Sequence, residues 1–201
     1  RSFLIDRVLP LHDTSTIFGD GAATKSTTAL AITLAVATGM AVGPFRPCQP
    51  AMTVMYLDWE TGEEEQKDRM DWLARGVGLA GVPRNICYRR PALSLPEQIG
   101  RVRAEVQRTQ TGFVILDSLG MACGGDSNES HVILATFSAL RSLANVTCLV
   151  LTHLSKGDAR RGKGETAFGS AYVANSSRSM WLIKRKEGGE SGTVLAAMYH
   201  K

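Results

Sequence analysis

The 201-residue sequence has no apolar run long enough to cross a membrane. Its N-terminal segment, RSFLIDRVLP, lacks the long apolar core and the small-residue cleavage site of a secretion signal. The chain starts at Arg1 rather than at a methionine, so we expect it to be a piece of a longer protein. Together these features predict a cytoplasmic location and no membrane partner.

Cysteine is scarce and widely spaced. The four cysteines are Cys48, Cys87, Cys123 and Cys148, and no two of them form a C-x-x-C pair. Three lie in or beside apolar stretches, where a thiol packs as a small hydrophobic group. This spacing indicates neither a zinc site nor a disulfide framework.

The sequence also lacks internal repeats and low-complexity linkers, and 44% of its residues are hydrophobic. That length and composition predict one domain covering residues 1–201. The net charge of +4 is modest but uneven, because cations gather between Lys156 and Lys163 while residues 63–65 are all glutamate. The basic cluster indicates either a polyanionic partner or a solvated surface loop.

Short apolar runs rich in β-branched residues alternate with longer helical stretches. This alternation predicts a three-layer α/β fold, with a mainly parallel central sheet covered by helices. The runs are continuous, as expected for strands that are buried on both faces. The predicted strands are residues 15–18, 53–57, 113–116 and 147–151, with a weaker one at 85–88.

Helices are predicted between the strands. The alanine- and leucine-rich segment 25–38 reads as a buried helix, and 127–144 as a further one. Two capping boxes, Thr61 with Glu64 and Ser94 with Glu97, predict the starts of two more. Near the C-terminus, runs 179–183 and 193–199, joined by the turn-forming EGGESG, predict an antiparallel hairpin.

The stretch FGDGAATKSTTAL, residues 18–30, nearly matches the phosphate-binding signature G-x-x-x-x-G-K-[ST]. It follows a predicted strand and begins a predicted helix, which is the context such a loop needs. The backbone N–H groups of such a loop and the helix N-terminus favour phosphate. The predicted nucleotide-binding residues are Gly19, Gly21, Ala22, Ala23, Thr24, Lys25, Ser26 and Thr27.

Three of these residues have individual roles. Lys25 would reach the β- and γ-phosphate oxygens, and we expect it to face solvent without a ligand. The Ser26 hydroxyl would bind Mg²⁺. Thr24 stands where the signature has its second glycine, and a positive φ there would cost about 1 kcal/mol.

Carboxylates follow two of the predicted strands. In FVILDSLG, Asp117 comes at the carboxyl end of a buried strand, where it could hold Mg²⁺ beside Ser26; a strand-end aspartate or helix cap is the structural alternative. In VMYLDWE, Glu60 could deprotonate an attacking water. Asp58 is the alternative base, but its place next to the strand favours a role in bracing the loop or capping the helix near Thr61.

With LVLTHLSKG and GETAFGSAYVANSSRSMW, these motifs make the chain resemble the RecA/DnaB superfamily of P-loop ATPases. The resemblance covers nearly the whole chain and is greatest to the RepA-type hexameric replicative helicases of plasmids and phages. It implies a RecA-like, AAA-type ATPase domain with ATP and Mg²⁺ as cofactors. Lys25 and Ser26 would bind Mg-ATP, Glu60 would be the catalytic carboxylate and Asp117 the Walker B acid.

The resemblance also implies that His153 senses the γ-phosphate, although a histidine at a strand end is by itself more simply structural. It implies a homo-oligomeric ring, expected to be a hexamer, with nucleotide bound between subunits. Phe168 stands where these helicases commonly have an arginine. Arg178 and Lys201 are therefore our first candidates for a trans-acting cation, and Arg185 is a further one.

The basic segment SKGDARRGKGET, residues 155–166, is too polar and glycine-rich for a core element, so we expect a mobile loop. In RecA-like motors the loop at this place faces the central channel. Lys156, Arg160, Arg161 and Lys163 are thus predicted to contact single-stranded DNA. The predicted function is the ATP-hydrolysing motor domain of a replicative DNA helicase. The alternatives are a filament-forming recombinase or mediator ATPase, and a non-hydrolysing nucleotide-binding switch.

Overall fold

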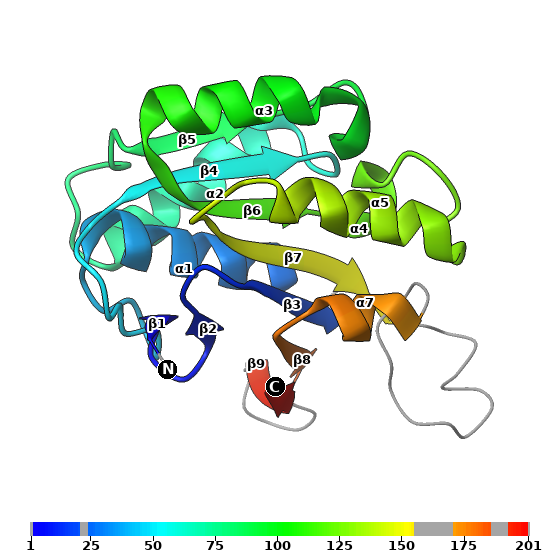
Figure 1. Cartoon of the computed structure of the whole chain (residues 1–201). Coiled ribbons are helices and arrows are strands. Elements are labelled where there is room, and N and C mark those ends of the chain that lie inside the picture. The colour runs from blue at the N-terminus through cyan, green and yellow to red at the C-terminus, as the bar shows by residue number, and fades with distance from the viewer. Residues whose placement is uncertain (1, 21–23, 155–170, 186–192, 201) are drawn as a thin grey trace.

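The computed structural model describes residues 2–20, 24–154, 171–185 and 193–200 (Figure 1). The strands, in chain order, are β1 (Phe3–Ile5), β2 (Leu9–Pro10), β3 (Thr14–Gly19), β4 (Thr53–Asp58), β5 (Ile86–Arg89), β6 (Thr111–Asp117), β7 (Thr147–His153), β8 (Ser179–Arg185) and β9 (Thr193–His200). The helices are α1 (Lys25–Thr38), α2 (Glu63–Gly76), α3 (Leu95–Thr109), α4 (Leu119–Ala122), α5 (Ser130–Arg141) and α7 (Ala171–Ser176).

The central sheet has seven strands in the order β5-β4-β6-β7-β3-β8-β9. The first six are mutually parallel, and β9 pairs antiparallel with β8 at the edge. Strands of this kind need helical crossovers, which the helices between them supply. The predicted α/β fold with a mainly parallel sheet and a C-terminal antiparallel hairpin is confirmed. The EGGESG turn itself lies outside the described residues.

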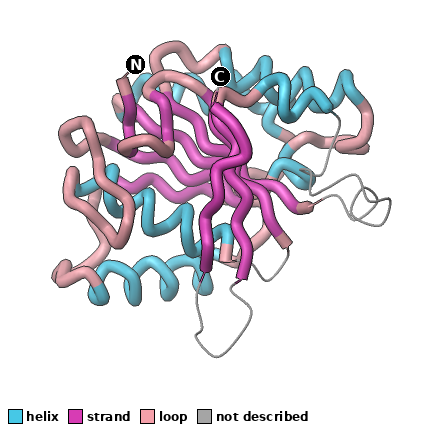
Figure 2. The backbone as a smooth tube through the Cα atoms, turned by 90° about the horizontal axis from the view of Figure 1, so that it is seen from below, coloured by secondary structure: helices cyan, strands magenta, loops and turns pink. Residues whose placement is uncertain are grey.

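Helices cover both faces of the sheet, and Figure 2 shows the strands running between the two groups. Alternate residues of each strand belong to two separate cores, because successive side chains point to opposite faces. Val54 and Tyr56 of β4 pack in the core that includes α1 and α2. Met55 and Leu57 pack in the core that includes α3 and α5. Burial on both faces explains why the strand sequences are continuously apolar.

Helix α1 has the predicted bounds and is buried along most of its length. Alanine and leucine suit this position because they are good helix formers and carry no polar group into the core. The helix ends at Gly39, whose φ of 69° is left-handed and whose N–H donates to the Ala35 carbonyl oxygen. A glycine accepts this conformation without the steric cost that a Cβ would bring.

The helix starts were predicted with mixed success. The capping box of Ser94 and Glu97 is confirmed at the start of α3. The Thr61 box was wrong, because α2 begins after Gly62, which makes no side-chain cap. The predicted helix 127–144 is shorter, since a turn ahead of α5 delays its start until Ser130. Elements β1, β2, α4 and α7 were not predicted, because all are shorter than the windows in which periodicity is visible.

Among the described residues, no helix has both the length and the apolar composition to cross a membrane. All four cysteines are free thiols.

Candidate active site

The carboxyl ends of four parallel strands meet at one edge of the sheet. These strands end at Gly19 (β3), Asp58 (β4), Asp117 (β6) and His153 (β7). The register pairs Asp58 with Asp117 and Gly19 with His153. Polar residues from four distant chain segments therefore gather at the edge where ligands bind in parallel α/β sheets.

The loop between β3 and α1 ends at Thr24. The predicted binding residues Gly21, Ala22 and Ala23 lie outside the described residues, but Thr24 is described and has φ 61° and ψ 28°. This is the left-handed region, which a β-branched residue occupies only at a steric cost. The positive φ that the phosphate-loop signature normally assigns to glycine is therefore present here on a threonine.

Lys25 is the first residue of α1 and is only 6% exposed. Its Nζ donates to the carbonyl oxygens of Asp20, at 2.8 Å, and Gly19, at 3.2 Å, and lies 3.5 Å from Nδ1 of His153. Burial lowers the pKa of Lys25, and nearby carboxylates, Glu60 foremost, raise it. The expectation of a solvent-facing ammonium group was wrong, because the carbonyl oxygens of the loop enclose it.

Asp117 is 1% exposed and is held by two hydroxyl groups. Its Oδ2 accepts a hydrogen bond from Tyr56 Oη at 2.7 Å, and the carboxylate also accepts one from Ser26. Burial raises the pKa of Asp117, whereas these two hydrogen bonds lower it. The structure thus brings Ser26 and Asp117 together, as predicted from the sequence. Thr27, the next residue of α1, is exposed.

The chemistry of this pair fits magnesium. Among the residues described, no group of three or more His, Cys, Asp or Glu side chains could hold an ion. Mg²⁺ does not need such a group, because it keeps several waters and binds one or two carboxylates together with substrate phosphates. Ser26 and Asp117 supply two oxygen ligands of the kind that Mg²⁺ prefers, beside the lysine of the loop.

Glu60 and His153 form a second polar pair at this edge. Glu60 Oε1 lies 3.4 Å from His153 Nε2. The hydrogen bond with His153 is the largest effect on Glu60 and, with one from Ser118, lowers its pKa to about 2 against the effect of burial. The Glu60 side chain is 43% exposed and the His153 side chain is 40% exposed, so water reaches both. His153 therefore contacts Lys25 through one ring nitrogen and Glu60 through the other.

Asp58 is fully buried and has a different surrounding. Its Oδ1 accepts from the backbone N–H groups of Glu60, at 2.8 Å, and Thr61, at 2.9 Å, while Oδ2 accepts from Tyr88 Oη at 3.2 Å. Burial raises the pKa of Asp58, and these hydrogen bonds lower it. Oδ1 holds the loop that carries Glu60, and Oδ2 ties the aspartate to Tyr88 of β5, so the geometry supports the bracing role for Asp58.

The sequence did not reveal the two tyrosines that hold these carboxylates. Tyr56 and Tyr88 lie on adjacent strands, β4 and β5, and their rings stack with centroids 6.3 Å apart. Each hydroxyl reaches one buried aspartate. In the sequence both read as ordinary strand aromatics, and only the strand pairing shows that they point at the site.

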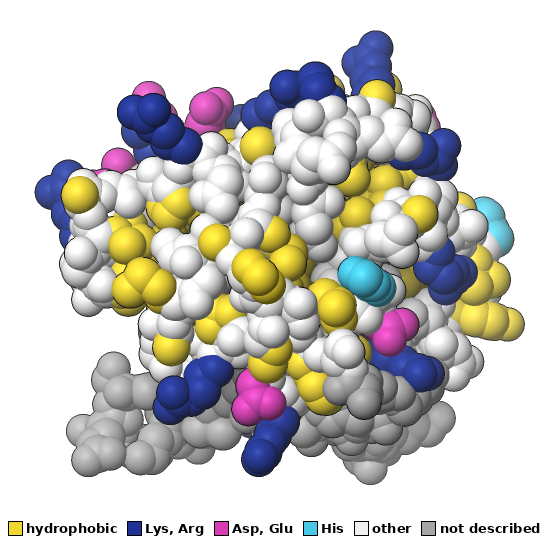
Figure 3. Space-filling view, turned by 60° about the vertical axis from the view of Figure 1, so that its left-hand side comes forward, with side chains coloured by type: hydrophobic (Ala, Val, Ile, Leu, Met, Phe, Trp, Pro, Cys, Tyr) yellow, Lys and Arg dark blue, Asp and Glu magenta, His cyan; other side chains and the backbone are white. Residues whose placement is uncertain are grey.

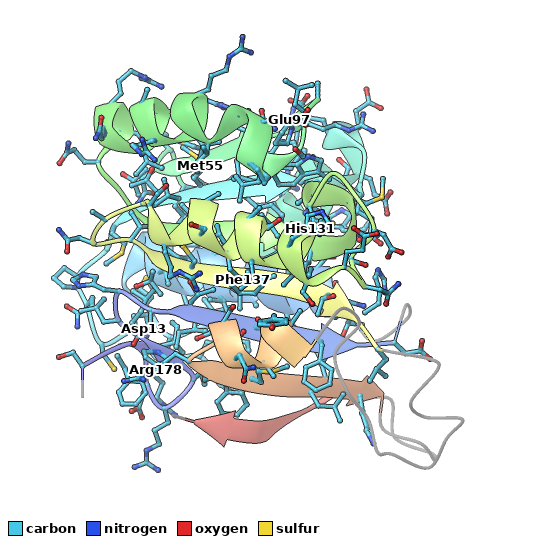
Figure 4. All side chains as sticks on the ribbon, turned by 45° about the vertical axis from the view of Figure 1, so that its right-hand side comes forward. Asp13, Met55, Glu97, His131, Phe137 and Arg178 are labelled. Carbon is cyan, nitrogen blue, oxygen red and sulfur yellow. The ribbon has the colours of Figure 1, made fainter. Side chains whose placement is uncertain are left out.

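Arg178 is not brought to this edge. It precedes β8, at the end of the sheet where β3 begins rather than where it ends (Figure 4). There its backbone N–H donates to the Thr14 carbonyl oxygen, and its Nε lies 3.5 Å from Asp13 Oδ2. The length of β3, about 20 Å at 3.3 Å per residue, separates it from Gly19. The other predicted cations, Lys156, Arg160, Arg161, Lys163 and Lys201, and Phe168 lie outside the described residues, as does the Arg185 side chain.

The sheet order, the loop between β3 and α1 and the polar edge define a P-loop ATPase domain with a RecA-like fold. The chain belongs to the AAA domain family, whose sequence profile matches residues 1–159. No curated protein sequence matches it significantly. Among solved structures it is similar to the KaiC-like protein PH0186 of Pyrococcus horikoshii OT3, with a TM-score of 0.70 over 98% of this chain and 83% of that chain. The identity is 13%, so this likeness shows the fold alone.

The backbone of Thr24 yields a prediction about stability. Thr24→Gly removes the Cβ from a left-handed residue, so the free energy of unfolding should stay equal or rise by up to about 1 kcal/mol, after allowing for the entropy that glycine adds to the unfolded chain. Thr27→Gly, on the exposed side of α1, should instead lower it by about 0.3 kcal/mol. Denaturant unfolding of both variants measures this, and a clear loss for Thr24→Gly would contradict the strain at this position.

The contact between His153 and Glu60 yields a prediction about ionisation. Because the hydrogen bond favours the charged carboxylate, His153→Phe should raise the pKa of Glu60 from about 2 toward its ordinary value, by about one unit or more. A ¹³C NMR titration of the glutamate carboxyl groups follows it directly. His131→Phe is the control, because His131 is 80% exposed and contacts Glu129 instead. An unmoved Glu60 titration in His153→Phe would show that the contact does not stabilise the carboxylate.

Proposed function

We propose that this chain is the ATP-hydrolysing motor domain of a replicative DNA helicase, acting on single-stranded DNA in the cytoplasm. The observation that carries the ATPase part is the convergence of Lys25, Ser26, Glu60, Asp117 and His153 at one edge of the sheet. These residues provide a cation for phosphate, two oxygens for a metal, an ionised carboxylate for water and a histidine that contacts the cation and the carboxylate.

Phosphate binding is assigned to the loop and to Lys25. The ammonium group is held at the start of α1 by two carbonyl oxygens, and the helix N-terminus adds a favourable dipole for anions. A triphosphate entering the loop would accept hydrogen bonds from Nζ in place of those carbonyl oxygens. The ammonium donor is charged in both arrangements, but phosphate oxygens carry negative charge that carbonyl oxygens lack, which favours the exchange.

Ser26 and Asp117 would hold Mg²⁺ beside the phosphates. The ion would neutralise negative charge on the β- and γ-phosphate oxygens during phosphoryl transfer. The Tyr56 hydroxyl occupies one oxygen of Asp117 and orients the carboxylate, so that Ser26 and Asp117 present their oxygens in a fixed arrangement.

Glu60 is assigned as the general base. As a water oxygen bonds to the γ-phosphorus, one water proton passes to the Glu60 carboxylate and the bond to the bridging oxygen breaks, which releases ADP. A carboxylate with a pKa of about 2 is ionised at neutral pH but weakly basic. A γ-phosphate that takes Lys25 and His153 as its own partners would remove two contacts that lower this pKa, and Glu60 would become more basic.

This exchange gives His153 a physical role in sensing the nucleotide. One imidazole lies within 3.5 Å of both the phosphate-binding lysine and the catalytic carboxylate. A change in the position of Lys25 would thereby alter the environment of Glu60. Water would be activated only when the γ-phosphate is in place, which suits an enzyme that couples hydrolysis to movement.

The helicase part of the proposal depends on the basic segment and on assembly. On the face shown in Figure 3, lysine and arginine side chains are dispersed around the rim rather than gathered into one stripe. We therefore assign DNA binding to Lys156, Arg160, Arg161 and Lys163, which follow β7 in the chain. A ring, proposed to be a hexamer, would place a cation of the neighbouring subunit at each nucleotide, with Lys201 and Arg178 as candidates. Unwinding of a forked duplex would distinguish a helicase from a filament-forming recombinase.

A non-hydrolysing nucleotide switch is the second candidate, and the left-handed Thr24 favours it. A Cβ at this position narrows the space in which the backbone bends around phosphates. Tight ATP binding without phosphate release, in the presence and absence of single-stranded DNA, would identify the switch.

The assignment of the base predicts a separation of binding from turnover. Glu60→Gln keeps the shape but removes the proton acceptor, so ATP should bind normally while phosphate release falls by about 10² or more. Lys25→Ala should lose nucleotide affinity, as measured with a fluorescent ATP analogue. Asp58→Asn is the matched control for amide substitution. If it abolishes turnover in a folded protein while Glu60→Gln hydrolyses ATP normally, the two roles are reversed.

The assignment of DNA binding predicts a salt dependence. Each arginine that neutralises a phosphate releases a counterion, so Arg160→Ala/Arg161→Ala should reduce the slope of log K against log[salt] for single-stranded DNA by about one to two units. Arg84→Ala/Arg101→Ala removes the same charge from exposed positions elsewhere and serves as the control. Equal slopes for the two double variants would remove the basic segment from the DNA path.

A further inference from the structure

A cavity of about 280 Å³ lies at the end of the sheet where β3, β7 and β8 begin, opposite to the nucleotide edge. Its walls come from the segment that enters β3, from the end of α5 with the turn that follows it, and from the end of α7. The polar residues in these walls include His12, Asp13, Arg141, Asn145, Ser177 and Arg178. The candidate active site does not use this space, because the length of the strands separates the two ends of the sheet.

Positive charge predominates around the cavity. Arg141 and Arg178 both line it, and Asp13 is the one acidic residue among the lining residues that the structure describes. Aspartate and glutamate are also absent from the three connections that enter β4, β5 and β7 at this end of the sheet, which are residues 39–52, 77–85 and 142–146. An anion is therefore the occupant that this charge distribution favours.

The two arginines have hydrogen-bond donors left for such an anion. Arg141 is exposed at the end of α5, and its side chain makes no ion pair or hydrogen bond with the other residues that the structure describes. Arg178 contacts Asp13 through Nε at 3.5 Å, which is too long for a strong hydrogen bond (Figure 4). A guanidinium group carries five N–H donors in a planar fork that matches the two oxygens of a carboxylate.

The backbone brings two further polar residues to the cavity wall in a left-handed conformation. His12 and Asn145 both have φ 60°. The His12 conformation is held by its backbone N–H, which donates to Thr147 Oγ1 at 2.8 Å. Within the described ranges the Asn145 side-chain amide has no hydrogen-bond partner, so its N–H groups are available to a ligand. Left-handed residues other than glycine gather at ligand sites, where the surrounding structure compensates their steric cost.

The helix ends at the cavity select among anions. Helices α5 and α7 both finish in its walls, and the C-terminal end of a helix carries partial negative charge. This field opposes the concentrated charge of a phosphate dianion more than the single charge of a carboxylate group. The volume lies at the lower end of the range for small-molecule pockets, which suits a compact molecule.

We propose that this cavity is a binding site for a compact carboxylate, such as a small dicarboxylic acid, held by Arg141 and Arg178 with the Asn145 amide as a further donor. The site is separate from the candidate nucleotide site, and its occupancy requires neither ATP nor hydrolysis.

The probe for this proposal is succinate, compared with succinamide, which has the same carbon skeleton and no charge. Binding is measured by titration calorimetry of the 201-residue chain at constant ionic strength. Succinate should bind about ten-fold or more tightly than succinamide, because hydrogen bonds between charged partners are the stronger ones. Inorganic phosphate should bind about three-fold more weakly than succinate, because of the helix ends. A saturating non-hydrolysable ATP analogue should leave the affinity for succinate unchanged.

Two variants locate the site. Arg141→Gln should weaken succinate binding by about ten-fold, because it removes a charged donor. Asn145→Gly should weaken it by about three-fold, because it removes the amide while glycine keeps the left-handed backbone without strain. Arg84→Gln is the matched control, since Arg84 is exposed in a connection at the same end of the sheet but does not line the cavity. Both Arg141 and Asn145 are exposed, so the melting temperatures of their variants should stay close to that of the parent chain.

The proposal is overturned if succinate does not bind, if succinamide binds equally well, or if phosphate binds more tightly. Equal losses in Arg141→Gln and Arg84→Gln would also overturn it, because they would show a general effect of charge rather than a site. Displacement of succinate by the ATP analogue would contradict it as well, because the cavity would then receive a nucleotide, as the proposed trans-acting role of Arg178 requires.

Discussion

The candidate active site depends on the parallel register of β3, β4, β6 and β7. Each of these strands is buried on both faces, so a slip of one residue would exchange the side chains of the two cores. With Tyr56 in one core and Leu57 in the other, such a slip is excluded by packing. The register that satisfies both cores also places Asp58 opposite Asp117 and Gly19 opposite His153. The apolar packing of the strands thereby determines which polar residues lie side by side at the carboxyl ends of the strands.

Two buried carboxylates are retained at this edge because each has donors of its own. Asp58 is held by backbone N–H groups and Tyr88, and Asp117 by Tyr56 and Ser26. Burial of a carboxylate without such partners would raise its pKa and favour the neutral form. The two tyrosine rings also stack on each other, with β4 and β5 side by side.

Continuous apolar strands and the buried helix α1 were predictable, because burial on both faces leaves a composition that local sequence shows directly. The sequence also indicated that Thr24 would be strained if its φ were positive, since Thr24 stands at a glycine position of the phosphate-loop signature. The Thr61 cap was wrong because Asp58 takes the N–H of Thr61 and the helix begins two residues later. A motif or a local pattern does not reveal which of several nearby side chains will accept the hydrogen bond of a given backbone N–H group.

The sequence by itself determined the fold class, the loop that ends at Lys25 and Ser26, and the strand ends that carry Asp117 and His153, because these follow from local hydrophobicity and residue spacing. Tertiary structure decided how these groups act on one another. It surrounds the ammonium group of Lys25 with carbonyl oxygens, places His153 against Glu60, and makes Asp58 a brace for the loop that follows β4. These outcomes depend on contacts between segments far apart in the chain, and on how burial changes the free energy of each charge, which no local pattern records.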